Sequence, residues 1–147
     1  MSIQENLKFD EENFAAWNAH DVDRSLALYS DDVVWQDVGI PEPLHGKEAV
    51  RQYVQGWFSA FPDIKLTVKN RLVTEDQVAG ELEWSGTQSG PLQLAPGAPA
   101  LPPTGKKVIG KGTYFVRVKN GKAAEVHTYP DNVGLMIQLG LMPMPGS

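Results

Sequence analysis

The dipeptide Asn120-Gly121 separates two long segments of alternating residues and constrains the fold more than any other feature of the sequence. A two-residue type I′ turn needs positive φ at both central positions, and Asn followed by Gly adopts this conformation readily. We therefore predict an antiparallel hairpin between strands at 107–119 and 122–129. The length of these strands indicates a curved antiparallel sheet.

Two spacings predict the remaining elements. Period-two alternation indicates strands at 33–38, 64–73 and 78–85. Apolar residues at helical spacing indicate helices at 3–17, 47–61 and 132–139. Asp21 is expected to cap a short helix that ends at Ser30-Asp31-Asp32. With helices early and most strands late, the order predicts an α+β fold whose bent sheet leaves a conical cavity for a small molecule.

The segment 86–105 is rich in Pro and Gly, which excludes a helix there. We interpret it as a long connection, and connections of this length are usually functional lids or disordered segments. The 147 residues suffice for one core and are few for two. We therefore expect a single domain over 1–147 that contains this loop.

Charge and composition exclude several classes of partner. The net charge is −5 and the basic residues form no run, so a nucleic-acid partner is not expected. The sequence contains no cysteine, which excludes disulfides and thiolate ligands. It begins with no signal-like segment and contains no run of about 18 apolar residues. We expect a cytoplasmic protein without membrane partners.

Five stretches of the sequence resemble the SnoaL-like polyketide cyclases, which belong to the superfamily of nuclear transport factor 2 and ketosteroid isomerase. They are LYSDDVVWQD, HGKEAVRQY, LPPTGKKVIG, VRVKNGK and YPDNVGLMIQLG, and they span most of the chain. The resemblance implies a cone-shaped α+β barrel, in which a curved antiparallel sheet wraps around N-terminal helices. It also implies a cyclase that acts without a cofactor on a hydrophobic, polyketide-like substrate.

Asp131 is the position at which the resemblance places the general acid/base of these cyclases. A histidine that assists it in some members corresponds to Tyr114, which could instead donate a hydrogen bond to an enolate oxygen or serve only as a strand residue. Asp131 also precedes the predicted terminal helix, where an Asp is a good N-cap. The two roles compete, because helix N–H groups that hold a carboxylate make it a weaker base.

Asp37 corresponds to the proton-shuttling aspartate of ketosteroid isomerase, and alternation places it on one face with Val33 and Trp35. The oxyanion-hole pair of the isomerase is not reproduced, because Asn13 or Phe14 stands near its tyrosine position and Gly112 or Thr113 near its aspartate position. Asp37 is therefore either the base of an isomerase or dehydratase, or a carboxylate at a strand end that faces solvent.

Six further side chains are candidates for the site. His127 shares a face with Glu125 and Tyr129 and is either a second titrating group at the cavity mouth or an ordinary solvated histidine. The aromatic candidates for substrate binding are Trp17, Trp35, Tyr53, Trp57 and Phe58. At core spacing, such aromatic residues more often serve packing.

These observations lead to three functional hypotheses. The first is a cyclase, a lyase or isomerase in type, that uses Asp131 in acid/base catalysis, and the second is an isomerase or dehydratase that uses Asp37. The third is a protein that binds small molecules without turnover, because folds of this kind also serve as binders. The dispersed histidines give no metal signature, and aromatic sheet faces suggest a homodimer.

Overall fold

The structure is a computed structural model that describes residues 2–146. Its helices are α1 (Ile3–Asn18), α2 (Val22–Leu26), α3 (Gly46–Ala60) and α4 (Asn132–Gln138). Its strands are β1 (Tyr29–Asp37), β2 (Leu44–His45), β3 (Lys65–Val73), β4 (Gln77–Thr87), β5 (Lys107–Lys119) and β6 (Lys122–Pro130). The predicted order of helices and long strands is confirmed.

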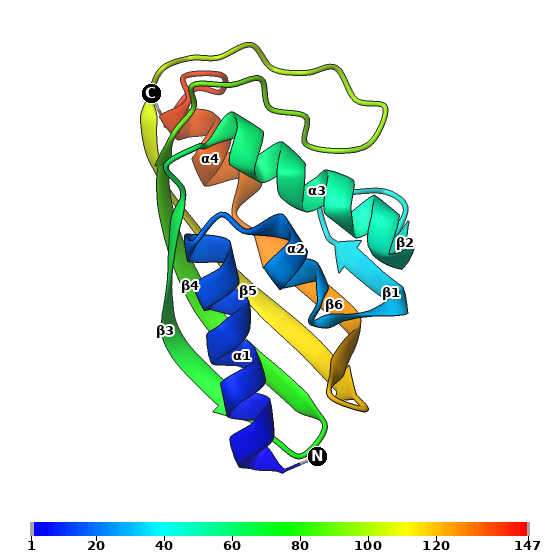
Figure 1. The fold of residues 1–147 in the computed structure, drawn as a ribbon. Helices are drawn as coiled ribbons and strands as arrows, with labels where there is room; N and C mark the ends of the chain where they lie inside the picture. The colour runs from blue at the N-terminus through cyan, green and yellow to red at the C-terminus, as the bar shows by residue number, and fades with distance from the viewer. Residues whose placement is uncertain (1, 147) are drawn as a thin grey trace.

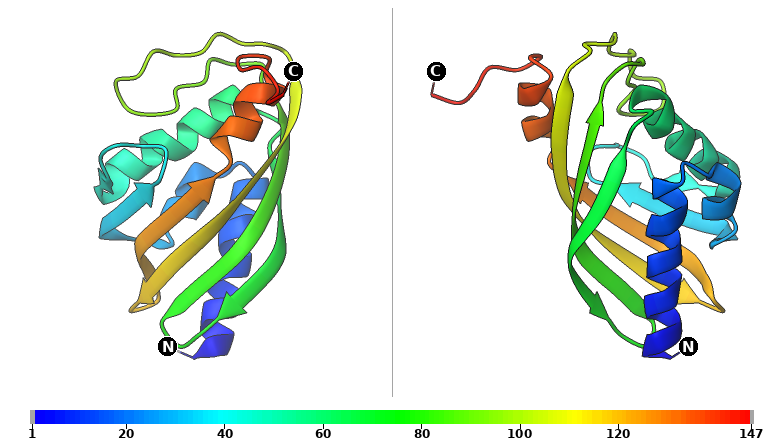
Figure 2. Two further views of the ribbon diagram at one scale, coloured as in Figure 1. Left: turned by 180° about the vertical axis from the view of Figure 1, so that it is seen from behind. Right: turned by 60° about the vertical axis from the view of Figure 1, so that its left-hand side comes forward.

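A single curved sheet in the order β2-β1-β6-β5-β4-β3 forms one wall of the molecule (Figure 1). Helices α1, α2 and α3 cover one face of it, and the opposite face is left uncovered by helices along most of its length (Figure 2). The sheet does not close, because β2 and β3 are its edges. The expected α+β fold with a cone-shaped interior is thus confirmed, as an open cone.

The pairing of β1 with β6 corrects the expectation of a purely antiparallel sheet. These two strands run parallel, with Trp35 opposite Val126 and Asp37 opposite Thr128, whereas the other four pairings are antiparallel. Parallel neighbours need a long crossover, and here most of the chain lies between the two strands. Alternation within one strand carries no information on the direction of its partner.

The β5–β6 hairpin forms as predicted, with φ of 53° at Asn120 and 77° at Gly121. The segment before β1 differs from the prediction, since Ser30-Asp31-Asp32 belongs to the strand and does not end a helix. Asp21 caps α2 as expected by accepting the N–H of Arg24. Tyr29 is drawn into β1 by its pairing with Ala123, which overrides the local helical spacing.

The register of β3 shifts between Val68 and Asn70. Before this bulge Leu66 and Val68 face the helices, as alternation predicts. After it, Arg71 and Val73 take that face and Leu72 is left 68% exposed on the other side. A bulge inserts one extra residue and so reverses the facing of the later residues in the strand. It is the bulge that brings Arg71 to α1.

The Pro- and Gly-rich connection begins after β4 and folds back on itself through a bridge between Leu92 and Leu101. The fully buried amide of Gln88 holds its two ends together by donating to the carbonyls of Gly90 and Pro102 and accepting from Thr104. Leu92 packs into the apolar cluster that contains Phe61, Trp84 and Leu135. Hydrogen bonds and a buried leucine therefore fix this loop.

Candidate functional site

A cavity of about 110 Å³ lies between the helices and the concave face of the sheet. Its walls are mainly aromatic and aliphatic, and all four tryptophans of the sequence line it: Trp17, Trp35, Trp57 and Trp84. Among the described residues, none of segment 88–105 lines it. The site is therefore shaped for an apolar molecule, and the expected lid role of the connection gains no support.

Asp37 lies at the end of β1 and lines this cavity, with 6% of its surface exposed. Alternation along β1 buries Val33, Trp35 and Asp37 together, as the sequence predicts. Both carboxylate oxygens have donors: Oδ1 accepts the N–H of Gly39 over 2.8 Å, and Oδ2 accepts the hydroxyl of Tyr53 over 2.7 Å. Hydrogen bonds of this kind stabilise the ionised carboxylate.

Tyr53 reaches Asp37 from α3 and is itself a cavity residue. Burial and the nearby carboxylate of Asp37 raise the pKa of the Tyr53 hydroxyl well above its usual value. Tyr53 therefore keeps its proton and acts as a hydrogen-bond donor to Asp37.

Asp131 lines the same cavity from the corner between β6 and α4, but its side chain is exposed. Its backbone N–H donates to the carbonyl of Lys111, which ties the corner to β5. Its Oδ1 accepts the N–H of Gly134 over 2.8 Å and so caps α4. Within residues 2–146, no donor to Oδ2 is described. Asp131 is thus a helix cap and a cavity residue together, with one carboxylate oxygen free for a ligand.

The loop that follows Asp37 and the helix that follows Asp131 are in contact through the side chain of Asn132. A side chain on Gly39 would collide with the amide nitrogen of Asn132, so glycine at this position lets the loop after β1 pack against the start of α4. Asn132 also lines the cavity. The sequence motifs did not indicate this contact, since Gly39 and Asn132 belong to segments far apart in the chain.

Tyr114 also lines the cavity, but its hydroxyl is committed elsewhere. It donates to Oδ2 of Asp10 over 2.7 Å, and Nε of Arg71 donates to the same oxygen over 2.6 Å. Burial raises the pKa of Asp10, although the bonds from Tyr114 and Arg71 oppose this rise. Asp10 is fully buried on α1 and does not line the cavity. Sequence analysis missed Asp10 and Arg71 because a strand bulge unites them.

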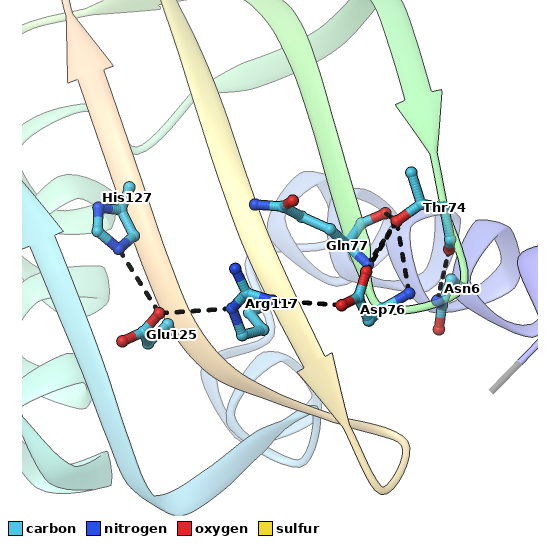
Figure 3. A network of polar contacts seen from close by, with 7 residues as sticks. All are labelled: Asn6, Thr74, Asp76, Gln77, Arg117, Glu125 and His127. Carbon is cyan, nitrogen blue, oxygen red and sulfur yellow. Dashed lines mark hydrogen bonds and ion pairs between the residues drawn. The ribbon is translucent and has the colours of Figure 1, made fainter.

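His127 lies on the opposite face of the sheet from the main cavity (Figure 3). Its Nε2 is 3.8 Å from Oε2 of Glu125, which also contacts Arg117, and Arg117 in turn reaches Asp76. The predicted sharing of a face with Glu125 and Tyr129 is confirmed, but this is the outer face. His127 and Asp37 line a second pocket of about 200 Å³ at the end of β1, but His127 does not line the main cavity that Asp37 and Asp131 share.

The aromatic candidates divide into two groups. Trp17, Trp35, Tyr53 and Trp57 line the cavity, whereas Phe58 does not and packs behind it against Trp17 and His20. Trp84 was not among the candidates, although the alternation of Val78, Gly80, Leu82 and Trp84 along β4 carries the signal that would have placed it inside. Thr128 was missed too, and it accepts the indole N–H of Trp35.

An open α+β cone around an aromatic cavity with two carboxylates at the ends of neighbouring strands defines a small-molecule site of the nuclear transport factor 2-like class. The family model described as SnoaL-like polyketide cyclase matches residues 10–139. The chain belongs to the SnoaL-like polyketide cyclase family.

Solved structures agree with this assignment. AclR, a candidate hydroxylase from Streptomyces galilaeus, is 27% identical with a TM-score of 0.83, over 99% of this chain and 87% of AclR. IdmH, a candidate polyketide cyclase from Streptomyces antibioticus, is 26% identical with a TM-score of 0.73, over 90% of this chain and 96% of IdmH. A SnoaL-like protein from Jannaschia shares the fold, with 19% identity, a TM-score of 0.81 and coverage of 95% and 94%. None of the curated proteins compared with the sequence matches it.

Across residues 2–146, no helix combines the length and the apolar character that a membrane span requires.

Proposed function

We propose that this protein is a cofactor-independent enzyme of the cyclase type, which closes a ring by an intramolecular aldol step on a hydrophobic, polyketide-like carbonyl compound. Asp131 is the acid/base. The observation that carries the proposal is the position of Asp131, which lines an aromatic cavity while only one of its two carboxylate oxygens is used by the helix.

The chemistry needs one proton-transfer group. The free oxygen of Asp131 removes a proton from a carbon flanked by carbonyls, and the C–H electron pair becomes an enolate. The enolate carbon bonds to an acceptor carbonyl carbon of the same molecule, and its C=O electron pair becomes an alkoxide. Asp131 returns the proton to that alkoxide. General acid/base catalysis of this kind contributes roughly 10²- to 10⁴-fold.

The helix cap serves this role in a specific way. The bond from Gly134 to Oδ1 fixes the orientation of the side chain. A base held rigidly near its target needs no reorganisation during the reaction. Capping and catalysis are thereby divided between the two oxygens.

A second candidate function places the base at Asp37, as in an isomerase or dehydratase. The position of Asp37 favours this alternative, because its carboxylate is buried in the wall of the same apolar cavity. The donors on both of its oxygens oppose it, since Gly39 and Tyr53 already occupy them.

The matched substitutions Asp131→Asn and Asp37→Asn separate these alternatives. The substrate for the assay is a fused-ring aromatic compound that carries a 1,3-dicarbonyl side chain and, on the adjacent ring position, a second carbonyl side chain as the aldol acceptor. Cyclised or dehydrated products are measured by mass spectrometry. We expect Asp131→Asn to lose at least about 100-fold in rate with unchanged ligand binding. A full rate in that variant contradicts the proposal, and a selective loss in Asp37→Asn supports the second candidate. Saturable binding without turnover by the unmodified protein supports a binding protein instead.

We further propose a homodimer formed by the outer sheet face, defined here by Leu72, Ile109, Phe115 and Tyr129. These side chains are 68%, 49%, 41% and 47% exposed. Phe115 and Tyr129 already pack edge to face, with ring centroids 6.1 Å apart. Apolar side chains gathered on one uncovered face are typical of a protein–protein interface.

A further inference from the structure

Several of the hydrogen-bond donors around the cavity are already committed to acceptors of the protein. Three tyrosine hydroxyls line it, and each donates inward to a fixed partner. The pairs are Tyr29 with Asn13, Tyr53 with Asp37 and Tyr114 with Asp10. The indole N–H of Trp35 donates to Thr128. None of these donors is free to hold a negative oxygen on a substrate.

Two more tryptophans face tyrosine hydroxyls. Burial raises the pKa of Tyr29 to about 12, and the indole of Trp17 beside its hydroxyl acts against this rise. The indole of Trp57 stands in the same relation to Tyr53, whose pKa is raised chiefly by burial. These two indoles therefore lie beside tyrosine hydroxyls that already have partners, and within residues 2–146 no hydrogen bond from either indole N–H is described.

The indole nitrogen of Trp84 lies over Gly110 of β5. Trp84 lines the cavity and is 9% exposed, and within residues 2–146 no acceptor for its Nε1 is described. The described side-chain atoms that are both sealed from solvent and unpaired are Asn6 Oδ1, Asp10 Oδ1 and Ser25 Oγ. Trp84 Nε1 is not one of them, so the indole nitrogen retains access to open space. A buried wall that keeps one such donor unpaired is suited to a ligand acceptor.

The Trp84 ring is held in place from several sides. Phe61 packs edge to face against it at 4.9 Å and Trp57 at 5.6 Å, measured between ring centroids. On β5, a side chain at Gly110 would collide with Cε2 and Nε1 of the indole, so only glycine leaves room for the ring there. The direction of the N–H is thus fixed before a ligand arrives, which is the condition for electrostatic preorganisation.

Trp84 and Asp131 lie at the same end of the cavity, which we call the acidic end because Asp37 and Asp131 both line it. Trp84 is paired with Gly110 on β5, and the next residue, Lys111, accepts the backbone N–H of Asp131. Leu135 of α4 lies in the apolar cluster that contains Trp84.

The amide nitrogen of Asn13 is also without an acceptor among residues 2–146, but it lies at the other end of the cavity. Asn13 is bound to Tyr29 at the start of β1, whereas Asp37 ends that strand. Their β6 partners, Ala123 and Thr128, are five residues apart because β1 is irregular between Tyr29 and Val34, so the Cα atoms of Tyr29 and Asp37 are about 17 Å apart at the usual rise per strand residue. Trp84 is accordingly a free donor at the acidic end, where the amide of Asn132 also lines the cavity and, within residues 2–146, has no described acceptor.

We propose that the indole N–H of Trp84 donates a hydrogen bond to the enolate oxygen that forms when a proton is removed from the substrate. This inference rests on the proposed cyclase function and adds the group that stabilises its anionic intermediate. Trp84 is then a catalytic residue, and its N–H distinguishes an anionic oxygen from a neutral one.

A coloured phenol tests this without turnover. A nitronaphthol titrates near neutral pH and absorbs differently as phenol and as phenolate, so a pH titration of the bound compound gives the ratio of its affinities in the two forms. Its phenolate oxygen stands in for the enolate oxygen. We expect Trp84→Phe to weaken phenolate binding about tenfold more than phenol binding, which raises the pKa of the bound compound by about one unit.

Trp57→Phe is the matched control, because Trp57 lines the same cavity and packs against Trp84, so this substitution changes the aromatic wall and keeps the Trp84 N–H. We expect this variant to weaken both forms of the compound equally. If Trp84→Phe does not fold, the benzothiophene analogue of tryptophan at position 84 keeps the bicyclic ring and removes only the donor, and the same tenfold selectivity is expected.

Equal weakening of phenol and phenolate when the Trp84 donor is removed overturns the inference and leaves the role of Asp131 intact. Full turnover in Asp131→Asn overturns that role and leaves the Trp84 result standing. The two failures are therefore distinguishable.

Discussion

The hydroxyl of Tyr53, on α3, donates a 2.7 Å hydrogen bond to Oδ2 of Asp37, at the end of β1. Replacing Tyr53 by Phe leaves that buried carboxylate oxygen without its donor. Since bonds to charged groups are the stronger ones, we expect a loss of about 1.5–3 kcal/mol in the free energy of unfolding. Denaturant titration measures it. Tyr29→Phe is the control, because the Tyr29 hydroxyl meets a neutral amide, and about 0.5–1.5 kcal/mol is expected. Equal losses in the two variants would contradict this account of the pair.

The raised pKa of Asp10 makes stability depend on pH in a definite direction. Because burial raises the folded-state pKa above the unfolded value of 3.8, the folded protein binds the proton more tightly. The contribution of Asp10 to stability is thus fully present below about pH 4 and is lost as pH rises through the folded-state pKa. We expect the difference in unfolding free energy between the unmodified protein and Asp10→Asn to fall over that interval and then to level off.

Tyr114→Phe supplies the internal check on Asp10. The Tyr114 hydroxyl bond lowers the pKa of Asp10, so its removal should raise that pKa and extend the falling region to higher pH. Unfolding free energies measured at a series of pH values give both curves. A difference curve for Asp10→Asn that rises with pH would show that the Arg71 ion pair outweighs burial.

Gln88 is predicted to hold the Pro- and Gly-rich connection. Gln88→Ala removes the amide that bridges both ends of the loop, and we expect a cost of about 2 kcal/mol or more together with rapid proteolytic cleavage within 91–103. Gln93→Ala is the control, because Gln93 makes one exposed bond within the loop, to Ala98. Its effect should stay within about 0.5 kcal/mol. Equal cleavage of the two variants would show that Gln88 is not the anchor.

Phe115→Glu should abolish the proposed dimer, because it places a charge at the centre of the outer sheet face. Phe115 is paired with Ala79 of β4 and with His127 of β6. Ala79 is paired in turn with Leu72 of β3, so these residues form one row across the sheet. Light scattering coupled to size exclusion gives the mass in solution. Ile3→Glu, at a residue 51% exposed on α1, should leave the mass unchanged. A monomeric unmodified protein would refute the dimer at once.

The sequence predicted the elements whose signals are local. The positive φ values at Asn120 and Gly121 and the cap by Asp21 follow from residue chemistry alone. Alternation correctly grouped Val33, Trp35 and Asp37, and equally Glu125, His127 and Tyr129. It does not state which side of the sheet a group occupies, and this is why His127 was considered for the cavity.

The rest depends on contacts between distant segments. Asp10, Arg71 and Tyr114 come from three elements, and the bulge at 68–70 that joins them has no sequence signature. The parallel pairing of β1 with β6 has no local sequence signal either, and this pairing places Asp37 and Asp131 at the same end of the sheet. The dual position of Asp131, cap and cavity residue, could be stated from the sequence as a conflict but could not be resolved without coordinates.

The parallel pairing of β1 with β6 also has a consequence for biosynthesis. Ser30 and its partner Ala123 are 93 residues apart, so β1 leaves the ribosome long before β6 exists. Pairings this distant are slow to form, because the entropy of closing a long loop must be overcome first. During that interval the edge of β1 that later pairs with β6 is open, and we expect the exposed carboxylates of Asp31 and Asp32 to oppose its association with other nascent chains. The cavity itself is completed only when the last strand docks.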